Sequence, residues 1–163
     1  MKLLDGQLNI DNFNPIRDNE KWILQLKNIN LFKLMQNINA KGFSATGLLK
    51  GKIPIIQKQG RLFIQNASLS SKSSGTLRYL YDNTPNFFEG DELELETISM
   101  ALKNYHYDTL ELKLNGPLDG DIDVSIIGKG VNPDLYGARR ISLNLKTKAK
   151  LKPLFKNIIK AQQ

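Results

Sequence analysis

The sequence predicts a mainly β protein of the α+β class. We expect a curved, twisted, antiparallel-rich sheet, open like a groove or taco, with a few short helices and a C-terminal amphipathic helix packed on it. Several segments alternate apolar and polar residues, as half-buried strands do, and turn-forming Gly, Pro, Asn and Asp residues separate them. The last residues instead carry apolar side chains at helical spacing. With 163 residues the chain suffices for one domain with one core, residues 1–163.

The first regular elements are a strand and a short helix. Residues 22–27 alternate, with Trp22 and the two leucines on one face. Asn30 is predicted to cap the helix that follows, because its side chain can accept a hydrogen bond from a free N–H of the first turn. Residues 31–38 then carry apolar residues at helical spacing. We expect residues 1–20 to be peripheral to the domain.

Residues 48–66 are predicted to form a hairpin that turns at Gln59-Gly60. Pro54 cannot donate a hydrogen bond to a neighbouring strand, so the first arm is bent there or lies at a sheet edge. Residues 75–80 are extended again, and residues 82–90 are predicted to form a loop rich in turn residues.

The second half begins with a helix and continues with strands. The acidic residues at the start of segment 91–104 suit the positive end of a helix dipole. Alternation over residues 105–114 places His106 and Asp108 on the face of the three leucines and the tyrosines on the opposite face. Two more alternating segments complete the predicted sheet, at residues 121–127 and 141–146.

The C-terminal helix is predicted most clearly. Its apolar residues form one stripe, and lysines lie off that stripe. Pro153 fits the first turn, where its missing N–H costs nothing. We expect the helix to dock on the sheet; contact with an anionic membrane surface is the alternative. The stripe consists of Leu151, Leu154, Phe155, Ile158 and Ile159.

Charge is segregated along the chain, whose net charge is +7. Residues 41–81 carry seven basic residues and no acid, residues 82–128 carry eleven acids, and residues 129–163 carry nine basic residues against one acid. Neutralisation within the molecule, with a solvated basic end, is our preferred interpretation, followed by binding to an anionic surface. Nucleic acid is disfavoured as a partner because no strip of alternating basic and aromatic residues is present.

Composition excludes several classes of protein. The absence of cysteine excludes disulfides, thiolate zinc sites and cysteine nucleophiles. No apolar run is long enough for a membrane-spanning helix, and the N-terminus lacks the pattern of a signal peptide. The chain is therefore expected to be either cytoplasmic or part of a longer exported protein.

No catalytic, metal-binding or cofactor-binding residue is predicted. His106, the one histidine, has only Asp108 near it in sequence, and a half-exposed strand histidine explains it. The acids of segment 91–96 are explained by a helix N-terminus. The triplet Asp119, Asp121 and Asp123 lacks the glutamate that closes a calcium-binding loop. We therefore expect a protein without enzymatic activity.

Aliphatic residues line more than one face of the predicted strands. If the sheet curls without closing, its inner face becomes an apolar trough, which suits an acyl chain because each buried methylene is worth about 0.8 kcal/mol. An ordinary core covered by helices explains the same residues. The residues we assign to the trough or to a plug at its end are Leu48, Ile53, Leu62, Ile64, Leu112, Ile122, Val124, Leu154, Phe155 and Ile158.

A diffuse pattern of glycine, proline and aliphatic residues over residues 20–160 resembles the C-terminal region of YdbH-like proteins, which belong to the AsmA-like group. The resemblance is carried first by residues 48–55 (LLKGKIPI), 60–67 (GRLFIQNA) and 75–79 (GTLRY). Further matches are residues 101–110 (ALKNYHYDTL), Leu114 with Gly116, and residues 130–133 (GVNP) before 141–144 (ISLN).

The resemblance implies a function in the envelope of Gram-negative bacteria. Proteins of this group are anchored in the inner membrane, cross the periplasm as a curved β-sheet groove and are implicated in moving phospholipid to the outer membrane; the region has also carried a dicarboxylate-transport label. The chain would then be the C-terminal fragment of a longer periplasmic protein. Its partners would be phospholipid acyl chains and a small outer-membrane lipoprotein that adds a strand to an open edge. A scaffold domain that binds no lipid is the alternative.

Overall fold

The computed structural model describes residues 1–11, 19–38, 42–80, 90–135 and 137–162. Within these ranges the chain forms a ten-stranded antiparallel sheet and three short helices, which confirms the predicted mainly β architecture. The strands are β1 (Lys2–Leu3), β2 (Gly6–Asp11), β3 (Lys21–Asn30), β4 (Phe43–Ala45), β5 (Leu48–Lys58), β6 (Arg61–Ser71), β7 (Gly75–Tyr79), β8 (Tyr105–Pro117), β9 (Ile122–Val131) and β10 (Arg140–Ala149). The helices are α1 (Leu31–Asn37), α2 (Glu92–Ala101) and α3 (Lys152–Gln162).

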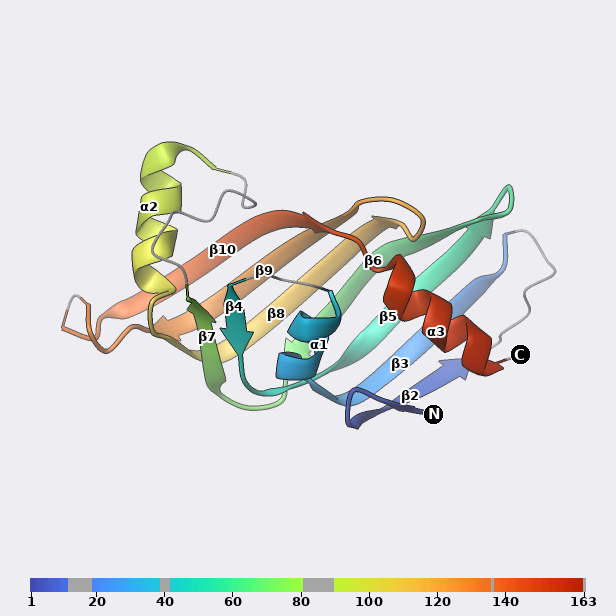
Figure 1. Ribbon diagram of the computed structural model, residues 1–163, viewed down its shortest axis with the longest axis horizontal. Coiled ribbons are helices and arrows are strands. Elements are labelled where there is room, and N and C mark those ends of the chain that lie inside the picture. Colours follow the sequence, from blue (N-terminus) through green and yellow to red (C-terminus); the bar gives the residue numbers. More distant parts are fainter. Residues whose placement is uncertain (12–18, 39–41, 81–89, 136, 163) are drawn as a thin grey trace.

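The sheet is open and branches at β8. Its main part runs in the order β2-β3-β5-β6-β8-β9-β10 (Figure 1). β8 pairs with β6 through its second half and with β7 through its first three residues, and β7 in turn pairs with β4. The outer edge of β10 pairs with no other described strand, so the sheet does not close into a barrel.

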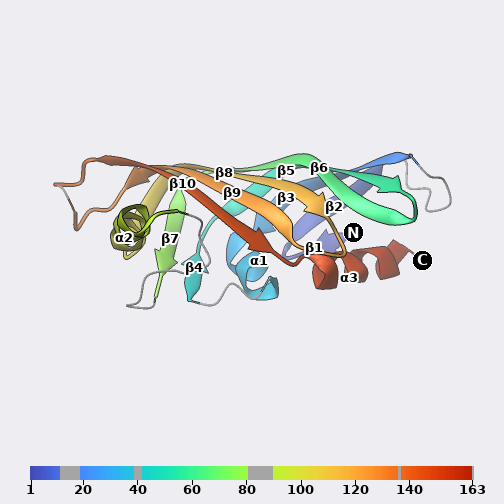
Figure 2. The same ribbon diagram turned by 90° about the horizontal axis from the view of Figure 1, so that it is seen from above.

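The two faces of the sheet differ in polarity, as alternating sequences require. On β9, for example, Ile122, Val124 and Ile126 are buried on one face, while Asp123 and Lys129 are exposed on the other. All three helices, together with β4 and β7, lie on the same side of the main sheet (Figure 2). The apolar face is therefore the covered face, and the polar face is open to solvent.

The turn of the first hairpin follows the prediction. Gln59 and Gly60 connect β5 to β6, and both have positive φ angles, 50° and 74°, as the favoured two-residue hairpin turn requires. The register between β5 and β6 shifts between Lys52 and Ile55. Pro54 lies in this irregularity of an inner strand, so of the two predicted alternatives the bent strand is correct.

The prediction for β8 is wrong at its beginning. A register shift between Tyr107 and Thr109 interrupts the pairing with β9, so the alternation does not run unbroken along the strand. The buried side chains before the shift are Tyr105 and Tyr107, with exposed fractions of 0% and 1%, whereas His106 is half-buried and Asp108 is exposed. A bulge of one residue thus exchanges the two faces.

Helices α1 and α2 begin where the sequence predicts, but α2 ends earlier than predicted. Asn30 caps α1 as predicted, since its side chain accepts a hydrogen bond from the backbone N–H of Lys33 (3.3 Å). Asp91 caps α2 with a reciprocal bond to Glu94. The predicted helix 91–104 is three residues too long, because α2 ends at Ala101. The predicted loop 82–90 lies, except for Gly90, outside the described residues.

Candidate functional site

A cavity of about 560 Å³ lies between the apolar face of the sheet and two helices, α1 and α3. We call it the trough. Side chains of β3, β5, β6, β8, β9 and β10 form its floor, and α1 and α3 form its walls. The side chains of the floor are Leu24, Leu26, Ile29, Ile53, Leu69, Leu112, Leu114, Val124, Ile126, Thr147 and Ala149.

Strand register arranges the floor in rows that cross the sheet. Because partners in neighbouring strands lie side by side, residues linked by register form one line perpendicular to the strands. Six strands at about 4.8 Å spacing make such a line roughly 24 Å long. One layer of acyl chains fills half the hydrocarbon thickness of a bilayer, which is roughly 15 Å. The line across the six strands is therefore longer than one such layer is thick. The unbroken row consists of Leu26, Gly51, Leu69, Leu112, Ile126 and Leu145. Its members Leu26, Leu69, Leu112 and Ile126 line the trough.

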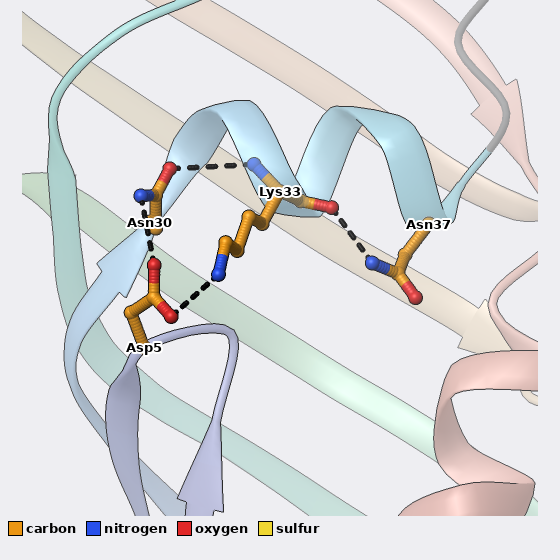
Figure 3. Close-up of polar contacts among 4 residues, drawn as sticks. All are labelled: Asp5, Asn30, Lys33 and Asn37. Atoms are coloured by element: carbon orange, nitrogen blue, oxygen red, sulfur yellow. Dashed lines mark hydrogen bonds and ion pairs between the residues drawn. The ribbon is translucent and has the colours of Figure 1, made fainter.

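The wall formed by α1 is fastened to the N-terminal strands. Leu34, Met35 and Ile38 face the trough. Figure 3 shows the contact on the other side: Lys33 Nζ lies 2.6 Å from an Asp5 carboxylate oxygen, and the Asn30 side-chain amide donates to the other oxygen at 3.2 Å. The hydrogen bond from Lys33 holds the pKa of the Asp5 carboxyl below its usual value. This clasp attaches α1 to the turn between β1 and β2.

The opposite wall is the apolar stripe of α3. Leu151, Phe155 and Ile158 are buried and Leu154 is half-buried, and all four line the trough. The predicted docking of this helix on the sheet is therefore correct for these side chains. The fifth predicted member of the stripe, the side chain of Ile159, lies outside the described part of the structure.

Polar groups in the trough lie near its ends. Asn37 belongs to the last turn of α1, while Thr147, Lys148 and Lys150 lie where β10 leads into α3. The lining contains no carboxylate and no histidine among the described residues. A predominantly apolar lining of this kind favours ligands whose hydrocarbon is removed from water on binding.

The structure brings together six of the ten residues assigned to a trough from the sequence. Ile53, Leu112 and Val124 lie in its floor, and Leu154, Phe155 and Ile158 lie in its α3 wall.

The other four predicted residues do not line the trough. Ile64 and Ile122 are fully buried beside it, with exposed fractions of 2% and 0%. Leu62 is partly buried against the core, and Leu48 precedes the buried Leu49 and so lies on the other side of β5.

Sequence reasoning missed Leu24, Leu26, Leu69 and the α1 residues, although their alternation or helical spacing was evident. Which of the buried residues share a cavity depends on strand order and on where the helices lie. Neither is encoded in the spacing of a single segment.

The end of the apolar face beneath β4 and β7 is filled. We call this region, centred on Tyr105 and Tyr107, the sealed end. The hydroxyl of Tyr107 donates to the backbone oxygen of Thr46 (2.6 Å), and the hydroxyl of Tyr105 donates to that of Ile141 (2.8 Å). Burial raises the pKa of Tyr105 to about 12 and raises the pKa of Tyr107 as well.

Asn132 closes the C-terminal end of α2 beside the sealed end. It is the one buried polar residue of the described core, and its amide donates to the carbonyls of Met100 and Ala101. Its side-chain oxygen accepts the N–H of Asp134 (2.9 Å). The bonds to the last carbonyls of α2 explain why that helix ends earlier than its sequence predicts.

The residues considered for catalysis are dispersed. The ring of His106 contacts the side chain of Asn104 (2.9 Å), whereas Asp108 pairs with Arg140. Asp119 and Asp123 pair with Arg61 and Lys148. Among the described residues no group of three acidic or histidine side chains could hold a metal ion.

None of the helices in the described ranges combines the length and the apolar character needed to cross a bilayer.

Comparison with known proteins gives one match. A family model described as "YdbH-like: Intermembrane phospholipid transport protein YdbH" matches residues 1–158. No curated protein and no solved structure matches the chain. Because the model covers nearly the whole chain, the protein belongs to the YdbH-like family.

Proposed function

We propose, from this family membership and from the trough, that the domain binds the acyl chains of phospholipids as a noncatalytic C-terminal module of a lipid-transfer protein that crosses the periplasm. The observation that carries the proposal is the apolar floor, which crosses six strands without a charged side chain facing into its unbroken row. The family is one of intermembrane phospholipid transport, a process that needs a path for hydrocarbon through water.

The size of the trough suits a weak and exchangeable complex. Ten methylene groups removed from water would contribute roughly 8 kcal/mol. Association costs an estimated 4–15 kcal/mol in lost freedom of motion, so the net affinity is modest. A transfer protein benefits from this balance, because a lipid that enters must also leave.

The direction of the floor supports movement along it. An acyl chain lying in the row from Leu26 to Leu145 passes from one strand to the next over similar side chains. At the β10 end the floor reaches the free edge of the sheet. We infer that lipid enters or leaves at this edge.

The same edge is the proposed contact for a small outer-membrane lipoprotein. The outer backbone groups of β10 have no partner strand among the described residues, and a strand of another chain can pair with them. Because the chain has no cysteine, single cysteines at Ser142 and Asn144 give clean crosslinking sites. We expect crosslinks to the lipoprotein from β10 and none from a cysteine at Gln25 on β3.

The decisive experiment compares two neighbouring isoleucines on β9. Ile126 faces the trough, whereas Ile127 lies on the opposite face and is half-buried. Ile126→Trp fills the trough, so lipid recovered with the purified protein, measured by native mass spectrometry, should fall sharply. Ile127→Trp makes the same chemical change outside the trough and should leave lipid occupancy unchanged.

Absence of phospholipid from the wild-type protein, or equal occupancy in both variants, would refute lipid binding in the trough. The alternative is then a scaffold domain of the cell envelope that binds no lipid, which the free edge of β10 also suits. Crosslinking from β10 would still succeed in that case.

A further inference from the structure

The last part of the chain carries a dense positive charge. From Leu135 to the C-terminus the sequence contains eight basic residues and no acid. Six of them lie close together in sequence. Across the junction of β10 and α3 they occupy every second position, and along α3 every fourth: Lys146, Lys148, Lys150, Lys152, Lys156 and Lys160. All six are exposed. This concentration of charge makes the region around the junction of β10 and α3 strongly positive.

Most of this charge is not neutralised within the protein. Lys148 pairs with Asp123 on β9 (2.6 Å). The other five make no ion pair in the part of the chain that the structure describes, and we call these five residues the lysine surface: Lys146, Lys150, Lys152, Lys156 and Lys160.

The acids nearest in the fold do not cancel this surface. The turn before β9 contains Asp119 and Asp121, and Asp119 is paired with Arg61. The hydrogen bond from Arg61 lowers the pKa of the Asp119 carboxyl, and Lys152 also helps to lower it, so Asp119 faces both Arg61 and Lys152. Two carboxylates, Asp119 and Asp121, therefore stand against five lysines and Arg61. The acidic helix α2 lies at the other end of the molecule (Figure 1).

The lysine surface adjoins the trough. Lys152, Lys156 and Lys160 are spaced four residues apart and so share one side of α3, while Phe155 and Ile158 of the same helix face the trough. Lys150 lines the trough itself, where β10 passes into α3. Positive charge and the lining of an apolar cavity therefore meet at the junction of β10 and α3.

We propose that the lysine surface docks on an anionic phospholipid bilayer and holds the β10 end of the trough against it. Charge complementarity selects a negatively charged surface, and the neighbouring apolar cavity is useful only where hydrocarbon is at hand. Duplex nucleic acid would match the charge but not the cavity. The inference goes beyond acyl-chain binding, since docking needs the lysines and not the trough.

The test measures binding of the full chain to vesicles by co-sedimentation. Vesicles of phosphatidylcholine with phosphatidylglycerol should bind the protein, and vesicles of phosphatidylcholine alone should not. Each lysine near an anionic surface contributes a factor of roughly five in affinity. The triple variant with Lys152→Gln, Lys156→Gln and Lys160→Gln should therefore bind roughly 100-fold more weakly. Added salt should weaken wild-type binding in the same direction.

A matched triple variant controls for net charge. Lys50, Lys52 and Lys113 are exposed on the polar face of the sheet, away from α3, and their change to Gln removes the same charge. This control should bind anionic vesicles nearly as well as wild type. An equal loss in both triple variants would overturn the proposal, because binding would then follow overall charge.

Two further measurements distinguish failure of the lipid-binding proposal from failure of the membrane-docking proposal. Ile126→Trp should empty the trough of lipid and still bind anionic vesicles, so the lipid proposal and the docking proposal are tested independently. The second measurement replaces the vesicles with short duplex DNA. If the DNA binds at the salt concentration used for the vesicles, and the α3 lysine variant loses DNA binding to the same degree, membrane docking is also overturned.

Discussion

The sealed end and the trough occupy the same face of the same sheet, yet one is filled and the other is hollow. At the sealed end, tyrosine rings fit against glycine backbone, and a Cβ added at Gly75 would overlap the Tyr107 hydroxyl and the Thr46 carbonyl oxygen. In the trough the floor consists of aliphatic side chains whose ends meet no partner of matching shape across the cavity. The two regions differ in what covers the face and in the β8 bulge, which turns Tyr105 and Tyr107 to the covered side at the sealed end.

The comparison shows how one strand pattern serves two purposes. At the sealed end the Tyr107 hydroxyl bonds to the Thr46 carbonyl beside β4 and so ties that covering strand to the sheet, while the Tyr105 hydroxyl bonds to Ile141 of β10 within the main sheet. The helices beside the trough border the cavity with apolar side chains, and α1 is attached to the N-terminal strands by the clasp of Lys33 and Asp5. The filled region therefore has close packing and hydrogen bonds, while the same sheet leaves space in the trough for the proposed ligand.

The largest effect is expected when the sealed end is broken. Tyr107→Ala removes a fully buried ring and its bond to Thr46, and should lower the free energy of unfolding by about 3–5 kcal/mol. Urea denaturation followed by circular dichroism measures this change. Lipid occupancy, normalised to folded protein, should be unchanged. A loss below about 1 kcal/mol would mean that this end of the face is not rigidly packed.

Truncating a side chain of the trough should lower the free energy of unfolding by less than Tyr107→Ala does. Leu112 is buried in the floor, but it borders space that is already present, so Leu112→Ala enlarges a cavity and does not create one. We expect a loss near the lower limit for such changes, about 2 kcal/mol, together with altered lipid occupancy. A cost equal to that of Tyr107→Ala would show that the trough is as tightly packed as the sealed end.

Much of this contrast could not be predicted from the sequence. Alternation in segments such as 121–127 correctly identified the buried face, and Asn30 correctly marked the start of α1, because both signals are local. Of the ten residues assigned to the trough, Ile53, Leu112 and Val124 line its floor, and the helical spacing of the C-terminal segment accounts for three more in its α3 wall. The bulge at Asp108 was not predicted, because one inserted residue leaves no compositional signal. Its consequence, the burial of two tyrosines, separates the sealed end from the trough.

Alkaline pH should destabilise the protein through the sealed end and leave the trough unaffected. The pKa of Tyr105 is raised by burial to about 12, above its ordinary value of 10.0, so the folded state retains a proton that the unfolded chain releases. The contribution of Tyr105 to stability is therefore fully present below pH 10.0 and is lost as the pH rises toward about 12. Denaturation curves across this interval should show the fall, and Tyr105→Phe should reduce its slope. Part of the slope should persist in that variant, because the pKa of Tyr107 is raised as well.

The smallest effect is expected at the clasp that fastens the α1 wall of the trough. Lys33 lowers the pKa of Asp5, so the pair stabilises the fold above the ordinary carboxyl pKa, and this contribution is lost as the pH falls through the lowered value. Both side chains are about half exposed, which keeps the energy small. Asp5→Asn should leave the unfolding midpoint almost unchanged and increase hydrogen exchange in α1 alone.

Because α1 is a wall of the trough, the Asp5→Asn variant should also exchange bound lipid faster. Asp119→Asn, which breaks a similar exposed pair with Arg61, should not change lipid exchange. Equal lipid exchange in the two variants would mean that the clasp does not control the position of this wall.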